Sequence, residues 1–154
     1  VSWFVFLHIS ERERLLARCW NALRPGGYLY VDDFHEIGQL TPTERRSLAV
    51  NVYCEWLPSI QLFAEQCERA GFAHVQVSDN TPAGVQFAKD RIDHWRDTRA
   101  RQIKVHGAEV TDGLDYFFHA VDELFQGGHF GLARVLARKV LAKDLQGERQ
   151  SARL

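Results

Sequence analysis

Three short stretches of this chain carry side chains that could do chemistry, and each follows an apolar run. They are residues 7–10, which include His8, residues 32–36, which begin with an acidic pair, and residues 79–81. An imidazole can take up or release a proton near neutral pH, and a carboxylate can hold a cation. Both groups also have ordinary structural uses, because a histidine can hydrogen-bond at a strand end and an aspartate can cap a turn. The elements around these stretches determine whether they meet.

The first half of the chain has the pattern of a strand, a helix and a second strand. Residues 1–7 are β-branched and aromatic with no polar alternation, which predicts a strand covered on both faces. Ser10 and Glu13 match a capping box, and apolar residues at helical spacing follow them over 15–23. A second apolar strand at 28–34 ends in the acidic pair. This βαβ order requires parallel strands and a right-handed connection.

Downstream, capping residues, prolines and glycines divide the chain further. We expect helices at 42–55, 59–71, 82–105 and 112–126, the last capped by Thr111 or Asp112, and strands at 74–79 and 132–141. Arginines and a lysine interrupt the apolar pattern of the last strand, which predicts a position at the margin of the sheet.

The summed pattern predicts an α/β fold with a mostly parallel sheet and extra helices inserted before and after the third strand. In open sheets of this kind, ligands bind at the carboxyl ends of the strands, beside the point where the strand order reverses. Residues 7–10, 32–36 and 79–81 follow three strand ends. We therefore expect any functional site to form along that edge.

Composition excludes several classes of protein. The chain has 154 residues, 45% of them hydrophobic and 25% charged, which suits one globular domain with a core of its own. A net charge of -1 gives no reason to expect nucleic acid or an anionic membrane as a partner. Cys19, Cys54 and Cys67 share no metal-binding spacing, so we expect buried free thiols and no metal site. The sequence carries no membrane-span or signal-peptide pattern, and we expect a cytoplasmic protein.

Several longer segments resemble a known family. SWFVFLHISERERLLARCWNALRPGGYLYVDDF, residues 2–34, resembles the second half of class I S-adenosylmethionine-dependent methyltransferases, in which a strand ends in a hydrophobic-His motif and an L-x-P-G-G-x-L turn leads to the next strand. NVYCEWLPS, AGFAHVQVSDNT, RIDHWRDTRAR, VHGAEV and LFQGGHFGLARVLARK look like small-molecule N-methyltransferases of the phosphoethanolamine and glycine-sarcosine type. The resemblance covers residues 1–139. It implies a partial Rossmann-like sheet with an antiparallel last strand and a lid of inserted helices.

The resemblance also implies a cofactor, S-adenosylmethionine, and a small-molecule methyl acceptor. His8 would lie beside both and bind the acceptor amine or accept its proton, since an amine must be neutral to attack the sulfonium methyl group. A carboxylate could steer a cationic amine, aromatic rings could face its nitrogen, and an arginine could bind a phosphate or carboxylate. The cofactor contacts implied are Ser2, Leu7 and His8, and the substrate contacts are Asp33, Phe34, Tyr53 and Arg91.

Each of these residue types also has a structural use. Aromatic residues at such spacing are more often core, charges on an amphipathic helix usually form a solvated face, and for Ser2 we favour the structural role. Family members hold the cofactor with a glycine-rich turn after their first strand, and this chain has none.

We therefore expect residues 1–142 to be the C-terminal part of a methyltransferase domain, with the N-terminal half of the same enzyme as partner, and residues 143–154 to be a polar, frayed tail. Two departures, DNTPAG and Phe130, separate this chain from the N-methyltransferase subgroup. The resemblance favours an amine nitrogen as the methyl acceptor, with an oxygen or sulfur acceptor on the same scaffold as an alternative. A non-catalytic remnant or interaction subunit is the alternative.

Overall fold

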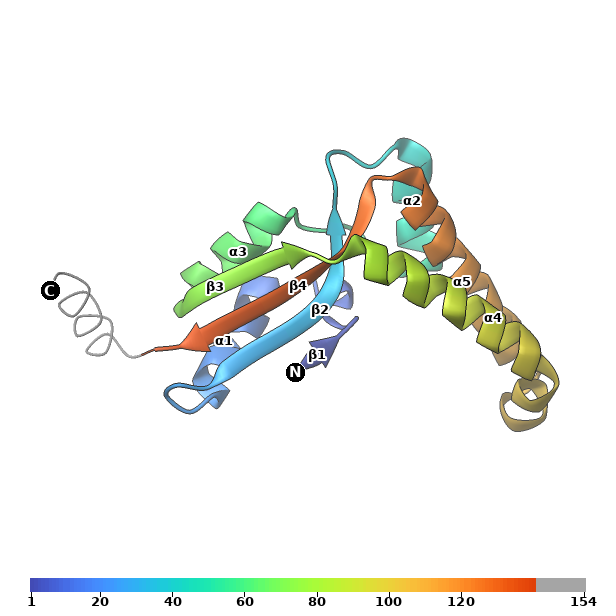
Figure 1. The fold of residues 1–154 in the computed structure, drawn as a ribbon, viewed down its shortest axis with the longest axis horizontal. Helices are drawn as coiled ribbons and strands as arrows, with labels where there is room; N and C mark the ends of the chain where they lie inside the picture. Colours follow the sequence, from blue (N-terminus) through green and yellow to red (C-terminus); the bar gives the residue numbers. More distant parts are fainter. Residues whose placement is uncertain (141–154) are drawn as a thin grey trace, which may run out of the picture. The chain divides into compact units, whose positions relative to one another are not determined.

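The structure is a computed structural model that describes residues 1–140. The expected tail at 143–154 lies outside the described residues. Figure 1 shows the order of the elements: β1 (Ser2–Trp3), a 3₁₀ helix (Phe6–His8), α1 (Arg12–Ala22), β2 (Tyr28–Glu36), α2 (Pro42–Asn51), α3 (Ile60–Arg69), β3 (Phe72–Asp79), α4 (Thr81–His106), α5 (Ala108–Gly127) and β4 (Phe130–Lys139).

The described chain divides into two compact units. Unit 1 contains Val1–Asp33, Ile60–Ser78 and residues 133–140, and unit 2 contains Phe34–Ser59 and Asp79–Leu132. Strands β2, β3 and β4 each contribute residues to both units. Within residues 1–140, no helix combines the length and the apolar character needed to cross a membrane.

The four strands form one sheet in the order β1-β2-β4-β3. β1 pairs with β2 in parallel, with Ser2 opposite Val31 and Trp3 opposite Asp32. In Figure 1 the arrow of β4 runs opposite to the arrows of β2 and β3. The expected α/β class and the antiparallel last strand are thus confirmed.

The predicted position of the last strand at the sheet margin is wrong, because β4 lies between β2 and β3. Its arginines do not need an open edge. Arg134 lies 5.4 Å from the ring centre of Tyr30, and Arg138 lies 5.8 Å from that of Tyr28. Each guanidinium therefore stacks on an aromatic ring of the neighbouring strand, on a face of the sheet where both can keep contact with water.

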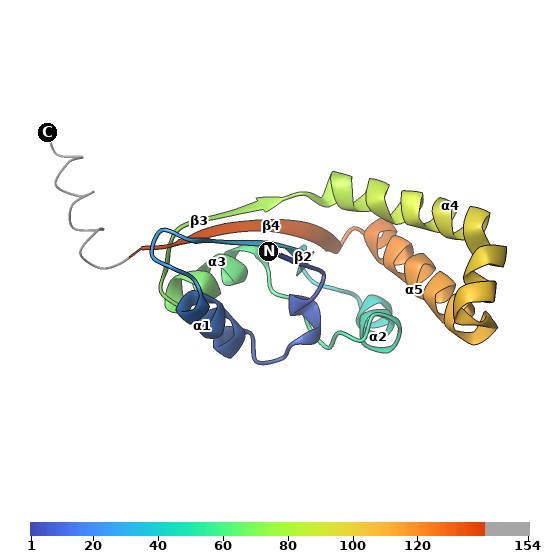
Figure 2. The same cartoon turned by 90° about the horizontal axis from the view of Figure 1, so that it is seen from below.

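Helices α1 and α3 pack against one face of the sheet in unit 1 (Figure 2). Their buried side chains meet the apolar residues of the strands, with Leu16, Phe63, Cys67, Leu29, Val31, Val135 and Ala137 in the shared core. Each such large side chain stabilises the fold by about 1.5–3 kcal/mol relative to an exposed one. Cys54 and Cys67 are buried free thiols as expected, whereas Cys19 is half-buried. Burial raises the pKa of Cys67 to about 12, so this thiol stays protonated and unreactive at neutral pH.

The opening strand is much shorter than predicted. β1 contains only Ser2–Trp3, after which Phe4 adopts a left-handed φ of 52° and the 3₁₀ helix Phe6–His8 begins. Phe6 and Leu7 are both buried, as a strand covered on both faces would also have it, but they are buried in the 3₁₀ helix. His8 therefore lies in a helical turn rather than at a strand end.

The predicted N-terminal caps of α1 and α5 are wrong. Helix α1 begins without the Ser10–Glu13 capping box, and its N-cap residue, Glu11, forms an ion pair with Arg14 instead. Helix α5 begins at Ala108, so Thr111 lies inside the helix and its hydroxyl donates to the carbonyl of Gly107 at 2.7 Å. A threonine can satisfy its hydroxyl this way within a helix, which removes the need for it to be a cap.

The predicted start of α2 is confirmed in detail. The Thr41 hydroxyl accepts the Glu44 N–H at 3.2 Å, and the Glu44 carboxylate accepts the Thr41 N–H at 2.7 Å. The helix ends at Asn51 rather than near residue 55. Gly128 adopts the left-handed conformation that stops α5, as the glycine pair predicted.

Gly71 supplies a test of the unit 1 core. It has a φ of 97°, its carbonyl accepts the Trp20 indole N–H at 2.9 Å, and an added Cβ would lie 3.2 Å from that nitrogen. We expect Gly71→Ala to lower the free energy of unfolding by more than the roughly 1–2 kcal/mol of a left-handed alanine, because Trp20 must also move. Gly38→Ala is the matched control, since Gly38 has a φ of 70° with nothing within 4 Å. Equal losses for the two variants in urea unfolding would show that the Trp20 contact contributes nothing.

Candidate functional site

The predicted site residues of unit 1 gather around the 3₁₀ turn. The Leu7 N–H donates to Oδ2 of Asp33 at 3.2 Å, which ties the turn to strand β2. Within the turn, the His8 N–H donates to the carbonyl of Val5 at 3.1 Å. The ring of Phe6 packs at 6.1 Å from that of Phe63 in α3. The turn is thus held from inside the unit, while the side of the chain at His8 is exposed.

The predicted cofactor contacts differ in what they can offer a ligand. His8 is exposed and Ser2 is half-buried, whereas Leu7 is buried and its amide is already bound to Asp33. A cofactor could therefore contact the side chains of His8 and Ser2. Leu7 instead serves as a buried part of the turn whose backbone is fixed by Asp33.

The acidic pair is divided between two sides of β2. The Asp32 carboxylate binds Arg134 through two bonds, from Nε to Oδ1 at 2.9 Å and from Nη2 to Oδ2 at 3.0 Å, and it accepts the Tyr30 hydroxyl at 3.0 Å. These hydrogen bonds raise the pKa of Arg134, and burial together with the Asp32 bond raises the pKa of Tyr30. Asp33 points to the opposite side, because successive residues of a strand alternate.

The three other predicted substrate contacts belong to different parts of unit 2. Phe34 is buried, and its ring packs at 5.9 Å from Phe125 and at 4.4 Å from Phe130, so its surroundings are those of a core residue. Tyr53 follows α2 and is 76% exposed. Arg91 lies on α4 with its guanidinium 5.1 Å from the ring centre of Phe87.

The sequence did not predict the polar bridge that His35, Asp79 and Thr81 form at the ends of β2 and β3. His35 is only 3% exposed, and its Nε2 lies 3.7 Å from Oδ1 of Asp79. The same oxygen accepts the Thr81 N–H at 2.8 Å and the Thr81 hydroxyl at 2.5 Å. The Thr81 hydroxyl oxygen also accepts the Leu132 N–H at 3.1 Å. The bridge therefore connects the first turn of α4 to the strands that flank it.

A glycine in β4 makes this bridge possible. A Cβ at Gly131 would clash with both side chains, because it would lie 2.5 Å from Nε2 of His35 and about as close to the hydroxyl oxygen of Thr81. Because β4 lies between β2 and β3, only a residue without a side chain lets groups from the two flanking strands meet above it. A glycine inside an otherwise apolar strand was the available signal.

Burial and hydrogen bonding shift both partners of the bridge. Burial lowers the pKa of His35, although the nearby Asp79 carboxylate acts in the opposite direction. Burial alone would raise the pKa of Asp79, but the Thr81 hydrogen bonds and the neighbouring histidine outweigh it and lower that pKa. Near neutral pH the bridge therefore joins a neutral histidine and an ionised aspartate.

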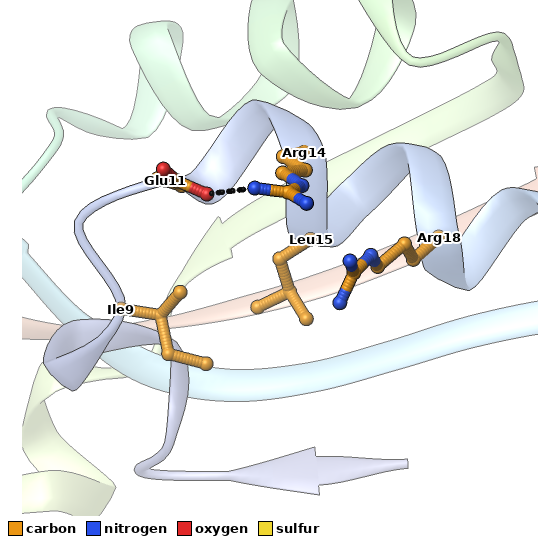
Figure 3. A pocket seen from close by; sticks show the side chains of 5 residues that line it. All are labelled: Ile9, Glu11, Arg14, Leu15 and Arg18. Atoms are coloured by element: carbon orange, nitrogen blue, oxygen red, sulfur yellow. Dashed lines mark hydrogen bonds and ion pairs between the residues drawn. The ribbon is translucent and has the colours of Figure 1, made fainter.

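A shallow pocket of about 410 Å³ lies on unit 1, and the residues that line it follow His8 in the sequence. Figure 3 shows its lining, in which Glu11 binds Arg14 on the rim. The complete lining is Ile9, Glu11, Arg14, Leu15 and Arg18. None of the predicted site residues lines it. In the part of the chain that the structure describes, no group of three or more His, Cys, Asp or Glu residues is placed to hold a metal ion.

No sequence family and no curated protein matches this chain. Solved structures do match its fold. A protein described as a sarcosine dimethylglycine methyltransferase from Galdieria sulphuraria superposes with a TM-score of 0.77 at 13% identity, over 90% of this chain and 51% of its own. Phosphoethanolamine N-methyltransferase 2 from Haemonchus contortus, in complex with phosphomonomethylethanolamine and S-adenosylhomocysteine, gives 0.77 at 16% identity, over 90% and 32%.

A third similar structure is the cyclopropane synthase MmaA2 from Mycobacterium tuberculosis, with a TM-score of 0.71 at 16% identity, over 90% of this chain and 55% of its own. The chain thus spans about half the length of two of these proteins and about a third of the other. At such identities the likeness establishes the fold. The fold predicted from sequence, a partial sheet of the methyltransferase type, is confirmed.

The His35 bridge predicts how stability depends on pH. An unfolded histidine takes up a proton near pH 6.5, whereas buried His35 does so only at lower pH. The unfolded chain then binds more protons, so we expect the free energy of unfolding to fall as the pH falls below about 6.5, by at most about 1.4 kcal/mol per pH unit for one proton. His35→Gln should flatten this part of the profile in urea unfolding between pH 5 and 7.5.

His106→Gln is the matched control, because His106 is exposed at the end of α4 and this variant should keep the wild-type profile. A wild-type profile in His35→Gln would show that the bridge does not contribute to the pH dependence.

Proposed function

We propose that this chain is part of an enzyme that transfers the methyl group of S-adenosylmethionine to a small molecule, and that the acceptor is an amine nitrogen. The observation that carries the proposal is the likeness of its fold to methyltransferases. The amine acceptor is favoured by the sequence segments that resemble small-molecule N-methyltransferases.

S-adenosylmethionine, when bound, supplies a methyl group on a positively charged sulfur. A lone pair of the acceptor attacks the methyl carbon, and S-adenosylhomocysteine is the leaving group. A protonated amine must first give up a proton to free its lone pair, and the nitrogen–carbon bond then forms as the carbon–sulfur bond breaks. His8 is the residue that we assign to this proton, because its side chain is exposed on a turn that packing and hydrogen bonds hold in place. Such a fixed turn suits a reaction whose rate depends mostly on alignment.

The resemblance also assigns residues of unit 2 to the acceptor. The exposed ring of Tyr53 suits a cationic nitrogen, and the guanidinium of Arg91 suits a phosphate or carboxylate. Phe34 suits a supporting role within unit 2, because its ring packs among other phenylalanines. The long α4 and α5 helices are the inserted helices to which the resemblance assigns the role of a lid.

A different acceptor atom is the second candidate. The likeness to a cyclopropane synthase supports it, since one fold serves several acceptors. Assays of the full-length gene product with amines, hydroxy acids and thiols distinguish these acceptors.

Cofactor binding is the first test. We expect calorimetry to show S-adenosylhomocysteine binding to the full-length gene product and no binding to the 154-residue chain alone, because the cofactor contacts assigned to this chain are few. Binding to the chain alone would place the whole cofactor site within these residues. Binding to neither protein would contradict the proposed methyltransferase activity and favour a non-catalytic interaction module.

His8 is the second test. We expect His8→Ala to lower kcat by about 100-fold or more, as loss of a proton-accepting group does, while the Kd of S-adenosylhomocysteine changes by less than about threefold. His106→Ala, at the exposed end of α4, should leave both values unchanged. Unchanged turnover in His8→Ala would remove His8 from the mechanism.

A further inference from the structure

We propose that Asp33 is a positioning residue for His8: its buried carboxylate holds the amide of Leu7 and so fixes the 3₁₀ turn that presents the histidine. This inference rests on the proposed function, in which His8 contacts the methyl acceptor. It replaces the role implied by the family resemblance, in which the same carboxylate contacts the substrate directly.

The burial of Asp33 is the first argument. The residue is 0% exposed, and its Oδ2 accepts the Leu7 N–H at 3.2 Å from a position 26 residues away in sequence. Moving a carboxylate out of water costs several kcal/mol unless hydrogen bonds compensate. The hydrogen bond from the Leu7 amide contributes to this compensation.

The weakness of the turn by itself is the second argument. β1 is only two residues long, and Phe4 already leaves the strand with a left-handed φ of 52°. Two 3₁₀ bonds then follow, from the His8 N–H to Val5 and from the Ile9 N–H to Phe6, both at 3.1 Å. Such bonds have poorer geometry than those of an α-helix. The Phe4 N–H donates to the Asp32 carbonyl at 2.9 Å before the turn, and Phe6 packs on Phe63 within it. The Asp33 carboxylate adds an anchor, the hydrogen bond that ties the backbone of the turn to β2 at Leu7.

The place of the anchor is the third argument. The Asp33 carboxylate acts on the amide of Leu7, the residue immediately before His8. The side chain of Leu7 is itself buried. A shift of the Leu7 backbone is thus passed directly to the position of the imidazole. Misplacement of a reacting group by about 1 Å can cost about 100-fold in rate.

A direct contact between Asp33 and a cationic substrate is the competing role. It requires an exposed carboxylate oxygen, and Asp33 has no exposed surface. Its neighbour Asp32 offers no replacement, because that carboxylate is bound by Arg134 and Tyr30. The acidic pair therefore serves the arrangement of the sheet and the turn.

The test compares two variants of the full-length gene product. Asp33→Asn keeps a side-chain oxygen that can accept the Leu7 N–H but carries no charge, whereas Asp33→Ala has no acceptor. We expect Asp33→Asn to keep kcat within about threefold and Asp33→Ala to lose about 10- to 100-fold, with the KM of the acceptor nearly unchanged in both. Adding Asp33→Ala to His8→Ala should cause no further loss, because the anchor acts through the histidine.

Two results would overturn the inference. If Asp33→Asn loses as much kcat as Asp33→Ala, or if both raise the KM of a cationic acceptor, the charge of Asp33 acts on the substrate. Asp33→Asn alone decides this point should Asp33→Ala not fold.

Hydrogen exchange at the Leu7 amide, followed by NMR, tests the contact without any activity. We expect slow exchange in the wild type and in Asp33→Asn, and fast exchange in Asp33→Ala. Slow exchange in a folded Asp33→Ala would overturn the positioning role by itself. A wild-type protein that transfers no methyl group to any acceptor would instead overturn the proposed function, while the exchange measurement would still report on the anchor.

Discussion

Polar side chains buried along β2 impose the constraint on which the rest of this structure depends. Asp32, Asp33 and His35 are all buried near the end of this strand. A buried polar group is costly unless it is hydrogen-bonded or paired, so each of the three calls for a partner from elsewhere in the chain. Arg134 in β4 binds Asp32, and the Leu7 amide in the 3₁₀ turn binds Asp33. The carboxylate of Asp79 at the end of β3 lies 3.7 Å from Nε2 of His35.

The position of β4 follows from the same requirement. Arg134 can bind Asp32 with two hydrogen bonds because β4 is the direct neighbour of β2 in the sheet. Gly131 of the same strand leaves space above it for His35 and Thr81. The strand β4 therefore supplies a positive charge at Arg134 and a position without a side chain at Gly131. Its polar residues are compatible with an interior position because they contact aromatic rings and carboxylates.

Fold and site contribute differently to the functional conclusion. The likeness to methyltransferase structures defines the architecture, and folds of this kind serve more than one acceptor. In the mechanism that we propose, the chemistry depends on individual groups, above all on the exposed His8, which follows a Leu7 amide held by a buried carboxylate. The proposed reaction class therefore comes with a named residue, His8, whereas activity assays identify the acceptor.

The sequence by itself determined the features that depend on neighbouring residues. The α/β order, the Thr41–Glu44 capping box and the glycine stop after α5 are all confirmed, because capping and turn formation involve groups a few residues apart. The Ser10–Glu13 motif shows the limit of such signals, since Glu11 became the N-cap in its place. The position of β4, the short β1 and the partners of Asp33 and His35 were decided by tertiary structure alone. These features depend on which strands become neighbours and on which buried groups must pair, and both are settled by contacts between residues far apart in the chain.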